Sequence, residues 1–302
     1  MGRIIVTGGL GFIGSHFVNL LYTKTKSEIV IVDKMTYASN INNVKVPHVL
    51  IKKDICELTE GDLGQFEYLI NFAAESHVDN SIKNGLPFVR TNVEGTYNLI
   101  EIARKNKNLI KFVQISTDEV YGDLDEYSSN TTSDESFNLN PSSYYSATKT
   151  SSDLLIISAN RTYGLPYIIT RTCNNYGENQ HKEKFIPTII NSIKEGKDIP
   201  VYGDGNQIRE WIHADDNAES IIKILFSEKI NHIFNIGTNE IYTNNDLINM
   251  VGEILGKKIN FKYVDDRLGH DRRYSLNSNK FISEFGEIQK IKLKDWMIRI
   301  LN

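Results

Sequence analysis

Two neighbouring carboxylates, Asp118 and Glu119, lie in a stretch, residues 116–122, that follows directly on an apolar run at residues 110–115. A pair of acids at the end of a buried strand packs poorly, but its two environments can hold one acid neutral and the other ionised. Such a pair can donate a proton at one atom of a substrate and remove a proton at another. We therefore interpret the stretch 116–122, with Thr117 beside the acids, as the reacting centre, although the acids could also merely cap a turn.

A glycine-rich turn lies between the first apolar run and the first helical pattern. Residues 7–14 satisfy Gly-x-Gly-x-x-Gly, and the spacing Gly-x-x-Gly-x-x-Gly is met as well, through Gly8, Gly9, Gly11 and Gly14. Glycine permits the tight turn and lets the backbone approach a pyrophosphate, which then lies on the amide-rich helix N-terminus. A glycine-rich turn alone is a weak signal, but a strand before it and a helix after it favour a dinucleotide site.

Asp33 ends the second apolar run. A carboxylate at this position accepts hydrogen bonds from an adenosine ribose and repels a 2′-phosphate, so the sequence predicts NAD and disfavours NADP. The third and fourth runs end at the same sheet edge, and the residues that follow them are predicted contacts for adenine and nicotinamide: Asp54, Ile55, Ala73 and Ala74.

Tyr145 and Lys149 are a second candidate for proton transfer. They lie four residues apart in a helical pattern that begins after Pro141, so they share one helical face. Lowering the pKa of a phenol from about 10 toward neutrality requires roughly 3–4 kcal/mol of preference for the anion. A nearby ammonium and an oxidised nicotinamide could supply that preference. A surface tyrosine with a helix-face lysine is the alternative, which the upstream glycine pattern disfavours.

Alternating elements must position these groups in the first two-thirds of the chain. Nearly continuous apolar runs predict parallel strands that are buried on both faces, and helical patterns lie between most of them. The predicted strands are Arg3–Thr7, Ile29–Asp33, His48–Lys52, Tyr68–Phe72, Lys111–Ser116 and Tyr167–Thr170, and the helices are Phe12–Tyr22, Phe88–Asn106 and Tyr144–Tyr163. This order predicts an α/β fold with a Rossmann-like, doubly wound parallel sheet.

The pattern loosens after Arg171. Helices are predicted at Phe185–Glu195, Asp216–Phe226, Asn244–Leu255, Ser278–Phe285 and Leu293–Leu301, with strands at Ile199–Tyr202 and His232–Ile236. We expect residues 1–171 to form an NAD-binding domain that carries the catalytic residues. Residues 172–302 are expected to form mainly a smaller α/β substrate-binding domain, with segments interleaved with the first.

Composition narrows the class of protein. The 302 residues carry 34 Lys and Arg against 38 Asp and Glu, a formal net charge of 34 − 38 = −4 without blocks of one sign, so nucleic acid is not an expected partner. The apolar run near the N-terminus is too short for a signal peptide or a membrane span, and we expect a soluble cytoplasmic protein. Cys56 and Cys173 are far apart and predict neither a disulfide framework nor a metal site.

The glycine turn, the Tyr-x-x-x-Lys pair and the extra C-terminal region resemble the extended short-chain dehydrogenase/reductase family. Its nucleotide-sugar members include 4-epimerases, decarboxylases and 4,6-dehydratases. Residues 116–122 resemble the dTDP-glucose 4,6-dehydratases, because epimerases carry small or hydroxyl residues at positions 118 and 119. Further matching segments are Phe72–Asp79, Thr91-Asn92, Asn138–Ser143, Asn174–Gly177, Val201–Gly205, Arg209-x-Trp211 and Gly269–Tyr274.

The resemblance implies a reaction with no net redox change. Tyr145 would take the proton of the sugar 4-hydroxyl while Thr117 holds the 4-oxygen. Glu119, ionised, would remove the C5 proton that the 4-ketone acidifies, and Asp118, protonated, would donate to the departing 6-hydroxyl. Hydride would pass from C4 to NAD and return to C6, giving a 4-keto-6-deoxy sugar of the kind used in deoxysugar biosynthesis.

The resemblance also implies binding residues. The cofactor set contains three of the glycines, both acids and the Tyr145–Lys149 pair. Its members are Gly8, Gly11, Phe12, Ile13, Gly14, Asp33, Lys34, Thr36, Asp54, Ile55, Ala73, Ala74, Ser76, Thr91, Tyr145, Lys149 and Asn175. The substrate set is Thr117 with His77, Asn174, Lys184, Phe185, Pro200, Val201, Tyr202, Arg209, Asn244, Asp266, Arg267, Gly269 and His270. Arg209 is the strongest of these, since a guanidinium pairs with phosphate oxygens. Loop residues that satisfy local turns are the alternative for the others.

One departure from the family pattern and several alternatives stay open. Leu268 stands where these dehydratases usually carry Pro, which bears on the preferred nucleoside. A UDP-sugar 4,6-dehydratase, a 4-epimerase and a non-enzymatic NAD-binding regulatory protein are alternatives to a dTDP-glucose dehydratase. The resemblance also implies a homodimer in which Phe88–Asn106 and Tyr144–Tyr163 form a four-helix bundle, whereas periodicity alone assigns their apolar faces to the sheet.

Overall fold

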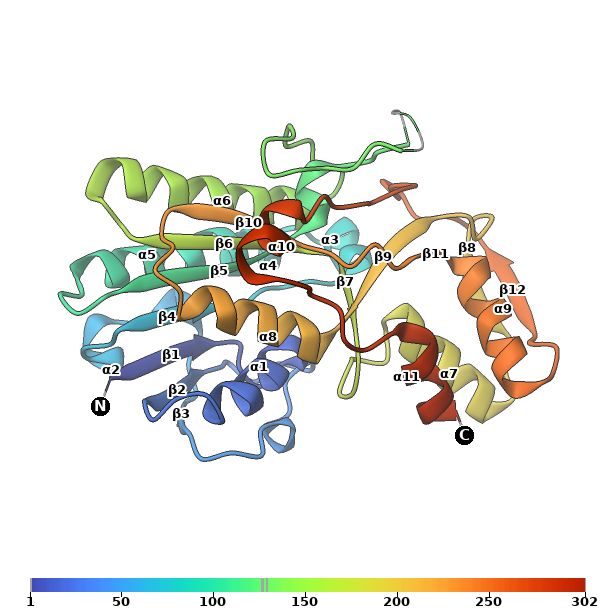
Figure 1. Ribbon diagram of the computed structural model, residues 1–302, viewed down its shortest axis with the longest axis horizontal. Coiled ribbons are helices and arrows are strands. Elements are labelled where there is room, and N and C mark those ends of the chain that lie inside the picture. The colour runs from blue at the N-terminus through green and yellow to red at the C-terminus, as the bar shows by residue number, and fades with distance from the viewer. Residues whose placement is uncertain (1, 126–127, 129, 302) are drawn as a thin grey trace.

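Seven parallel strands form the central sheet of the computed structural model, which describes residues 2–125, 128 and 130–301 (Figure 1). Their spatial order is β10-β6-β5-β4-β1-β2-β3. The strands are β1 (Arg3–Thr7), β2 (Glu28–Val32), β3 (Val49–Ile51), β4 (Tyr68–Asn71), β5 (Lys111–Thr117), β6 (Tyr167–Thr172) and β10 (His232–Ile236). The doubly wound parallel fold predicted from the apolar runs is therefore confirmed.

Helices cover both faces of this sheet because its side chains alternate between two cores. Ile4 of β1 packs into one core and Ile5 into the other. The first core contains residues of α1 (Phe12–Tyr22), α8 (Ala214–Leu225) and α10 (Asn279–Phe285), and the second contains residues of α5 (Thr96–Lys105) and α6 (Tyr144–Tyr163). The remaining elements of this part are η1 (Ile41–Asn43), η2 (Ile55–Glu57), α2 (Glu60–Leu63), α3 (Val78–Lys83), α4 (Leu86–Phe88), η3 (Val89–Gly95) and η4 (Asp118–Tyr121).

The long helix predicted over Phe88–Asn106 is interrupted. A π-helical segment, η3, separates α4 from α5. Asn92 within it exchanges hydrogen bonds with the backbone of Glu75 at 2.9 and 3.0 Å and donates to Thr148 Oγ1 of α6 at 2.9 Å. Tertiary bonds of this kind, which the spacing of apolar residues does not encode, accompany the wider turn.

A smaller group of elements lies beside the carboxyl ends of the large sheet (Figure 1). It contains the sheet β11-β9-β7 and the pair β12-β8, with a separate core that includes Tyr176, Trp211 and Trp296. Its strands are β7 (Asn174–Tyr176), β8 (Ile199–Tyr202), β9 (Ile208–His213), β11 (Ile241–Thr243) and β12 (Phe261–Val264), and its helices are α7 (Phe185–Glu195), α9 (Asn244–Leu255) and α11 (Leu293–Leu301). The sequence pattern predicted only β8 among these strands.

The chain returns to the large sheet after residue 171. Strand β10 pairs in parallel with β6, and α8 packs against α1. The strand predicted at His232–Ile236 is therefore present, but it belongs to the large sheet and not to the smaller C-terminal group. Its partner strand could not be predicted, because strand pairing depends on tertiary contacts. A division into two domains at residue 171 stays a prediction. In the part of the chain that the structure describes, no helix has the length and apolar character needed to cross a membrane.

Candidate active site

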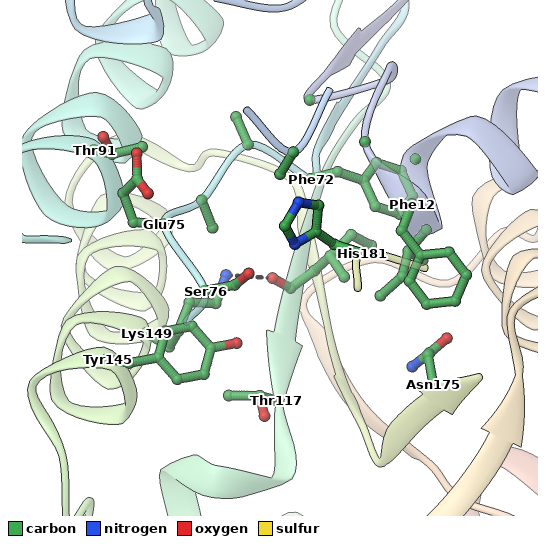
Figure 2. Close-up of a pocket in the computed structure, with 18 of the residues that line it drawn as sticks. Phe12, Phe72, Glu75, Ser76, Thr91, Thr117, Tyr145, Lys149, Asn175 and His181 are labelled. Carbon is green, nitrogen blue, oxygen red and sulfur yellow. Dashed lines mark hydrogen bonds between the residues drawn. The ribbon is translucent and has the colours of Figure 1, made fainter. Parts of the chain in front are cut away.

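One cleft at the carboxyl ends of the parallel strands contains every residue predicted to bind the cofactor (Figure 2). Parallel sheets place the loops of all their strands at this edge, which explains why residues far apart in sequence meet there. The cofactor set lining the cleft is Gly8, Gly11, Phe12, Ile13, Gly14, Asp33, Lys34, Thr36, Asp54, Ile55, Ala73, Ala74, Ser76, Thr91, Tyr145, Lys149 and Asn175. The predicted catalytic residues line the same cleft.

The glycine turn brings backbone close to backbone. Gly8 has φ +68°, and a Cβ built on it would lie 2.6 Å from the amide nitrogen of Ala73. A Cβ on Gly14 would lie 2.3 Å from the carbonyl oxygen of Gly8. Gly11 is the N-cap of α1 and has no side chain to occupy the helix end. The free amides at that end favour an anion such as a pyrophosphate, so the turn fits a dinucleotide.

Asp33 is fixed by three donors from two segments. Its Oδ1 accepts hydrogen bonds from the Met35 amide and the Ser39 hydroxyl, both at 2.8 Å, and its Oδ2 accepts from the Leu10 amide at 3.1 Å. Only 5% of the residue is exposed. A carboxylate held at the mouth of the glycine turn is suited to accept hydrogen bonds from a ribose.

The predicted reacting centre lies where β5 ends. Thr117 is the last residue of the strand; its hydroxyl donates to Asp118 Oδ1 at 3.1 Å and accepts from the Glu119 amide at 3.3 Å. Asp118 is 3% exposed, and its Oδ2 has no hydrogen-bond partner among the described residues. Burial, followed by the charge of Glu119, raises the pKa of Asp118 well above its usual value. This arrangement favours the protonated form of Asp118.

Glu119 stands in a different electrostatic environment. Burial raises its pKa, but the nearby cations Arg267, Arg209 and Lys184 act in the opposite direction. Two of these cations come from the C-terminal third of the chain and one from the start of α7. The two adjacent acids are thus distinguished by which charges surround them, which favours ionisation of Glu119 over ionisation of Asp118.

Tyr145 and Lys149 project from α6 toward the end of β5 (Figure 2). Lys149 is 4% exposed, and its Nζ donates to the carbonyl oxygen of Ile115 at 2.5 Å. Burial lowers the pKa of Lys149 to about 8, with Asp153 opposing the shift. Burial, then the charges of Glu119 and Asp118, raises the pKa of Tyr145. The lowering of the phenol pKa that the sequence predicts is therefore not seen in the protein without its ligands.

A buried polar network supports this helix face. Asp153, one turn beyond Lys149, accepts a hydrogen bond from Nε of Arg171 at 3.0 Å, and both side chains are almost fully buried. Arg171 Nη1 also donates to the Tyr121 hydroxyl at 3.0 Å, and that hydroxyl donates to Asn235 Oδ1 at 2.8 Å. The network joins α6, β6, η4 and β10 behind the reacting centre.

The predicted substrate residues fall into two groups. Thr117, Asn174, Lys184 and Phe185 line the cleft. The others do not line it: His77, Pro200, Val201, Tyr202, Arg209, Asn244, Asp266, Arg267, Gly269 and His270. His77 Nε2 lies 3.8 Å from a carboxylate oxygen of Glu183, and Glu183 lines the cleft.

Part of the second group lies in the loop at residues 265–271, which is held by contacts within itself and with neighbouring segments. Nη1 of Arg267 lies 3.6 Å from Asp79 Oδ1, and Nδ1 of His270 lies 2.6 Å from Asp266 Oδ1. Gly269 approaches Ser142, three residues before Tyr145, so closely that a Cβ on it would lie 2.9 Å from the carbonyl oxygen of that serine. The loop at residues 265–271 therefore reaches the segment that leads into α6.

Two of these predictions change in detail. Val201 is fully buried in the core of the smaller group, because β8 alternates buried and exposed residues, so the prediction that it contacts the substrate directly is wrong. Arg209 is 6% exposed; its guanidinium donates to the carbonyl oxygens of Ile208 and Asp271 and lies 4.4 Å from the centre of the Tyr274 ring. Its orientation is thus fixed by the protein.

Comparison with known proteins agrees with this geometry. Residues 4–237 match the NAD dependent epimerase/dehydratase family. The chain belongs to this family. It is 40% identical to the low-salt glycan biosynthesis protein Agl12 of Haloferax volcanii (92% of this chain, 90% of the relative) and 40% identical to a dTDP-glucose 4,6-dehydratase of Escherichia coli (94% and 87%). The structure of DesIV, a dTDP-glucose 4,6-dehydratase of Streptomyces venezuelae with NAD and TYD bound, matches with a TM-score of 0.92 and 38% identity (99% and 95%).

Membership in the NAD dependent epimerase/dehydratase family confirms the predicted resemblance and agrees with the predicted cofactor. The cleft also contains residues that the sequence analysis did not select: Ser39, Lys53, Phe72, Glu75, Gln180, His181, Glu183 and Trp211. Glu75 lay within a segment already noted for its resemblance, whereas the loop around His181 carried no pattern. Within the described ranges, no group of three or more His, Cys, Asp or Glu residues is arranged to hold a metal ion.

Proposed function

We propose that this protein catalyses the NAD-dependent dehydration of a nucleotide-diphospho-glucose, most specifically dTDP-glucose, to the 4-keto-6-deoxy sugar. The observation that carries the proposal is the pair Asp118 and Glu119 at the end of β5, where burial favours a proton on one acid and nearby cations favour charge on the other. The Escherichia coli relative and DesIV are named for this reaction.

NAD, when bound, supplies a hydride acceptor for C4 and later the hydride for C6. Tyr145 takes the proton of the 4-hydroxyl, and Thr117 binds the 4-oxygen. Glu119 removes the C5 proton while Asp118 protonates the leaving 6-hydroxyl, which departs as water, and Glu119 then returns its proton to C5. The proton gained by Tyr145 replaces the one lost by Asp118 through exchange with solvent, so atoms and charge balance over one turnover.

The test follows product from dTDP-glucose and UDP-glucose in parallel. In Glu119→Gln the rate of keto-deoxy sugar formation is expected to fall about 10²- to 10⁴-fold, the usual contribution of a general base. Partial reduction of bound NAD should persist, because oxidation at C4 does not need Glu119. Glu284→Gln, which removes a carboxylate that pairs with Lys229 outside the cleft, is the matched control. An undiminished product rate in Glu119→Gln would overturn the assignment.

The alternatives give different products. A 4-epimerase needs no proton removal at C5, so it has no use for a protonated and an ionised acid side by side. A UDP-sugar dehydratase would turn over UDP-glucose faster than dTDP-glucose in the parallel assay. A regulatory NAD-binding protein would turn over neither nucleotide sugar.

We also propose a homodimer formed through the face of α4, η3, α5 and α6. This face exposes large apolar side chains, with exposed fractions of 73% for Leu86, 54% for Tyr97, 61% for Tyr144 and 52% for Leu154. Continuous apolar surface on a soluble protein marks an association site. Leu154→Glu is expected to give a monomeric mass by light scattering at micromolar concentration, whereas the control Ile241→Glu on β11 should stay dimeric. A monomeric mass for the unmodified protein would contradict the proposal.

A further inference from the structure

Lys34 is the cation nearest in sequence to the predicted ribose acid, Asp33, and it lines the cofactor cleft. Its ammonium is held by three neighbouring side chains. Lys34 Nζ donates to Glu75 Oε1 at 3.1 Å and to Thr91 Oγ1 at 3.1 Å, and it lies 3.8 Å from Asp54 Oδ2. Two carboxylates and a hydroxyl thus surround one ammonium at this end of the cleft, where Figure 2 shows Glu75 beside Thr91.

The position of Glu75 is itself set by the fold. Its backbone amide donates to Asn92 Oδ1 and its carbonyl oxygen accepts from Asn92 Nδ2, at 2.9 and 3.0 Å. Asn92 lies in the π-helical segment and donates in addition to Thr148 on α6. The Glu75 backbone is therefore fixed independently of its side chain, which leaves the carboxylate free to act on Lys34.

The consequence concerns the 2′-phosphate that distinguishes NADP from NAD. Binding of a phosphate next to a ribose-binding acid requires a cation that can pair with the phosphate oxygens. Lys34 follows that acid directly, but Glu75 and, more weakly, Asp54 compete with a phosphate for its ammonium. Lys53, another lysine of the cleft, is held by Asp62 at 2.7 Å.

We propose that Glu75 is a cofactor-specificity residue: by binding Lys34, it withholds from NADP the cation that would otherwise accept the 2′-phosphate. Repulsion by Asp33 is then only one of two causes of NAD preference. The inference rests on the proposed cofactor but not on the proposed substrate, because it concerns dinucleotide affinity alone.

Calorimetric titration with NAD and with NADP tests the inference. In Glu75→Gln, which keeps the size of the side chain, the ratio of the Kd for NADP to the Kd for NAD is expected to fall about tenfold, as expected for one added charge-assisted contact to phosphate. The double variant Lys34→Gln with Glu75→Gln should return the ratio to that of the unmodified protein. Glu284→Gln, which makes the same change in net charge outside the cleft, should leave the ratio unchanged.

Asp54→Asn provides a second variant in case Glu75→Gln does not fold, which its melting curve would reveal. The asparagine Oδ1 can still accept from the Cys56 amide, as Asp54 does at 3.0 Å, and the NADP to NAD ratio should again fall. An unchanged ratio in Glu75→Gln, or a gain that persists without Lys34, would overturn the inference. Failure of the unmodified protein to bind NAD would instead contradict the cofactor itself.

Discussion

The reacting centre and the loop at residues 265–271 differ in how they are held. The reacting centre is buried between a strand and a helix: Asp118 is 3% exposed and Lys149 is 4% exposed. The loop lies at the surface, with Leu268 77% exposed, and side-chain pairs such as His270–Asp266 hold it. Burial is the main influence on the protonation of Asp118 in the reacting centre. The loop instead carries charged side chains at the surface of the protein.

The reaction and the nucleotide preference therefore depend on different parts of the enzyme. Burial is the largest cause of the raised pKa of Asp118, so the proton on this acid depends mainly on the strand and helix that enclose it. An exposed loop can exchange residues at little cost in stability, so preference for a nucleotide can vary while the chemistry stays the same. The two regions interact through charge, since Arg267 of the loop acts on Glu119.

Removal of one partner of a buried pair gives the largest expected effect. In Asp153→Asn the free energy of unfolding should fall by about 3–5 kcal/mol, because the variant leaves Arg171 charged in the interior. The matched variant Asp204→Asn breaks the exposed pair with Arg272, which lies at 2.9 Å, and should leave stability within experimental error because solvent screens that pair. Urea unfolding measures both, and equal losses would contradict the contrast between the two regions.

The pH dependence of turnover should also come from the buried region. Lys149 loses its proton as the pH rises through about 8, and Asp118 needs its proton as well, so kcat should fall on the alkaline side. Asp153 raises the pKa of Lys149, and its neutralisation in Asp153→Asn should move the alkaline limb to lower pH by about one unit. A profile of kcat between pH 6 and 10 checks this shift. A limb that does not move would show that Asp153 acts only on stability.

Changes in the loop should mainly alter binding. Arg267→Gln is expected to raise KM about tenfold through loss of a charge-assisted contact. Arg267 lowers the pKa of Glu119 and so opposes the effect of burial on that pKa. The variant should therefore also raise the pKa of Glu119. Glu119 must be ionised to accept a proton, so the acid limb of the rate should begin at higher pH. Steady-state kinetics at several pH values measure both effects, and a loss confined to kcat at the pH optimum would contradict a binding role.

The smallest effect is expected at Leu268, whose side chain is mostly in solvent. Leu268→Pro, which introduces the residue usual in the dehydratases that this segment resembles, should change kcat/KM for dTDP-glucose and UDP-glucose less than threefold each. Competition between the two substrates measures the change. A reversal of preference would show that the loop backbone, rather than the charged side chains around it, selects the nucleotide.

Sequence reasoning succeeded where the determining contacts are local. The glycine turn, the strand before it and the helix after it lie within residues 3–22, and they occur as predicted. Tyr145 and Lys149 share a helix face because they are one turn apart on α6. The interrupted helix around Asn92 and the pairing of β10 with β6 depend on contacts with distant segments, and neither could be read from periodicity.

Residue type and apolar period predicted most of the strands and helices of the first 171 residues, the anion-binding turn and the acids at the end of β5, because these signals act over one or two turns. The charges that surround those acids come from distant segments and could not be predicted in this way. Lys34 meets Glu75 across 41 residues, and Arg171 meets Asp153 across two elements of the core. The proton affinity of each acid depends on its burial and on every charge nearby, and the packing of distant segments sets both.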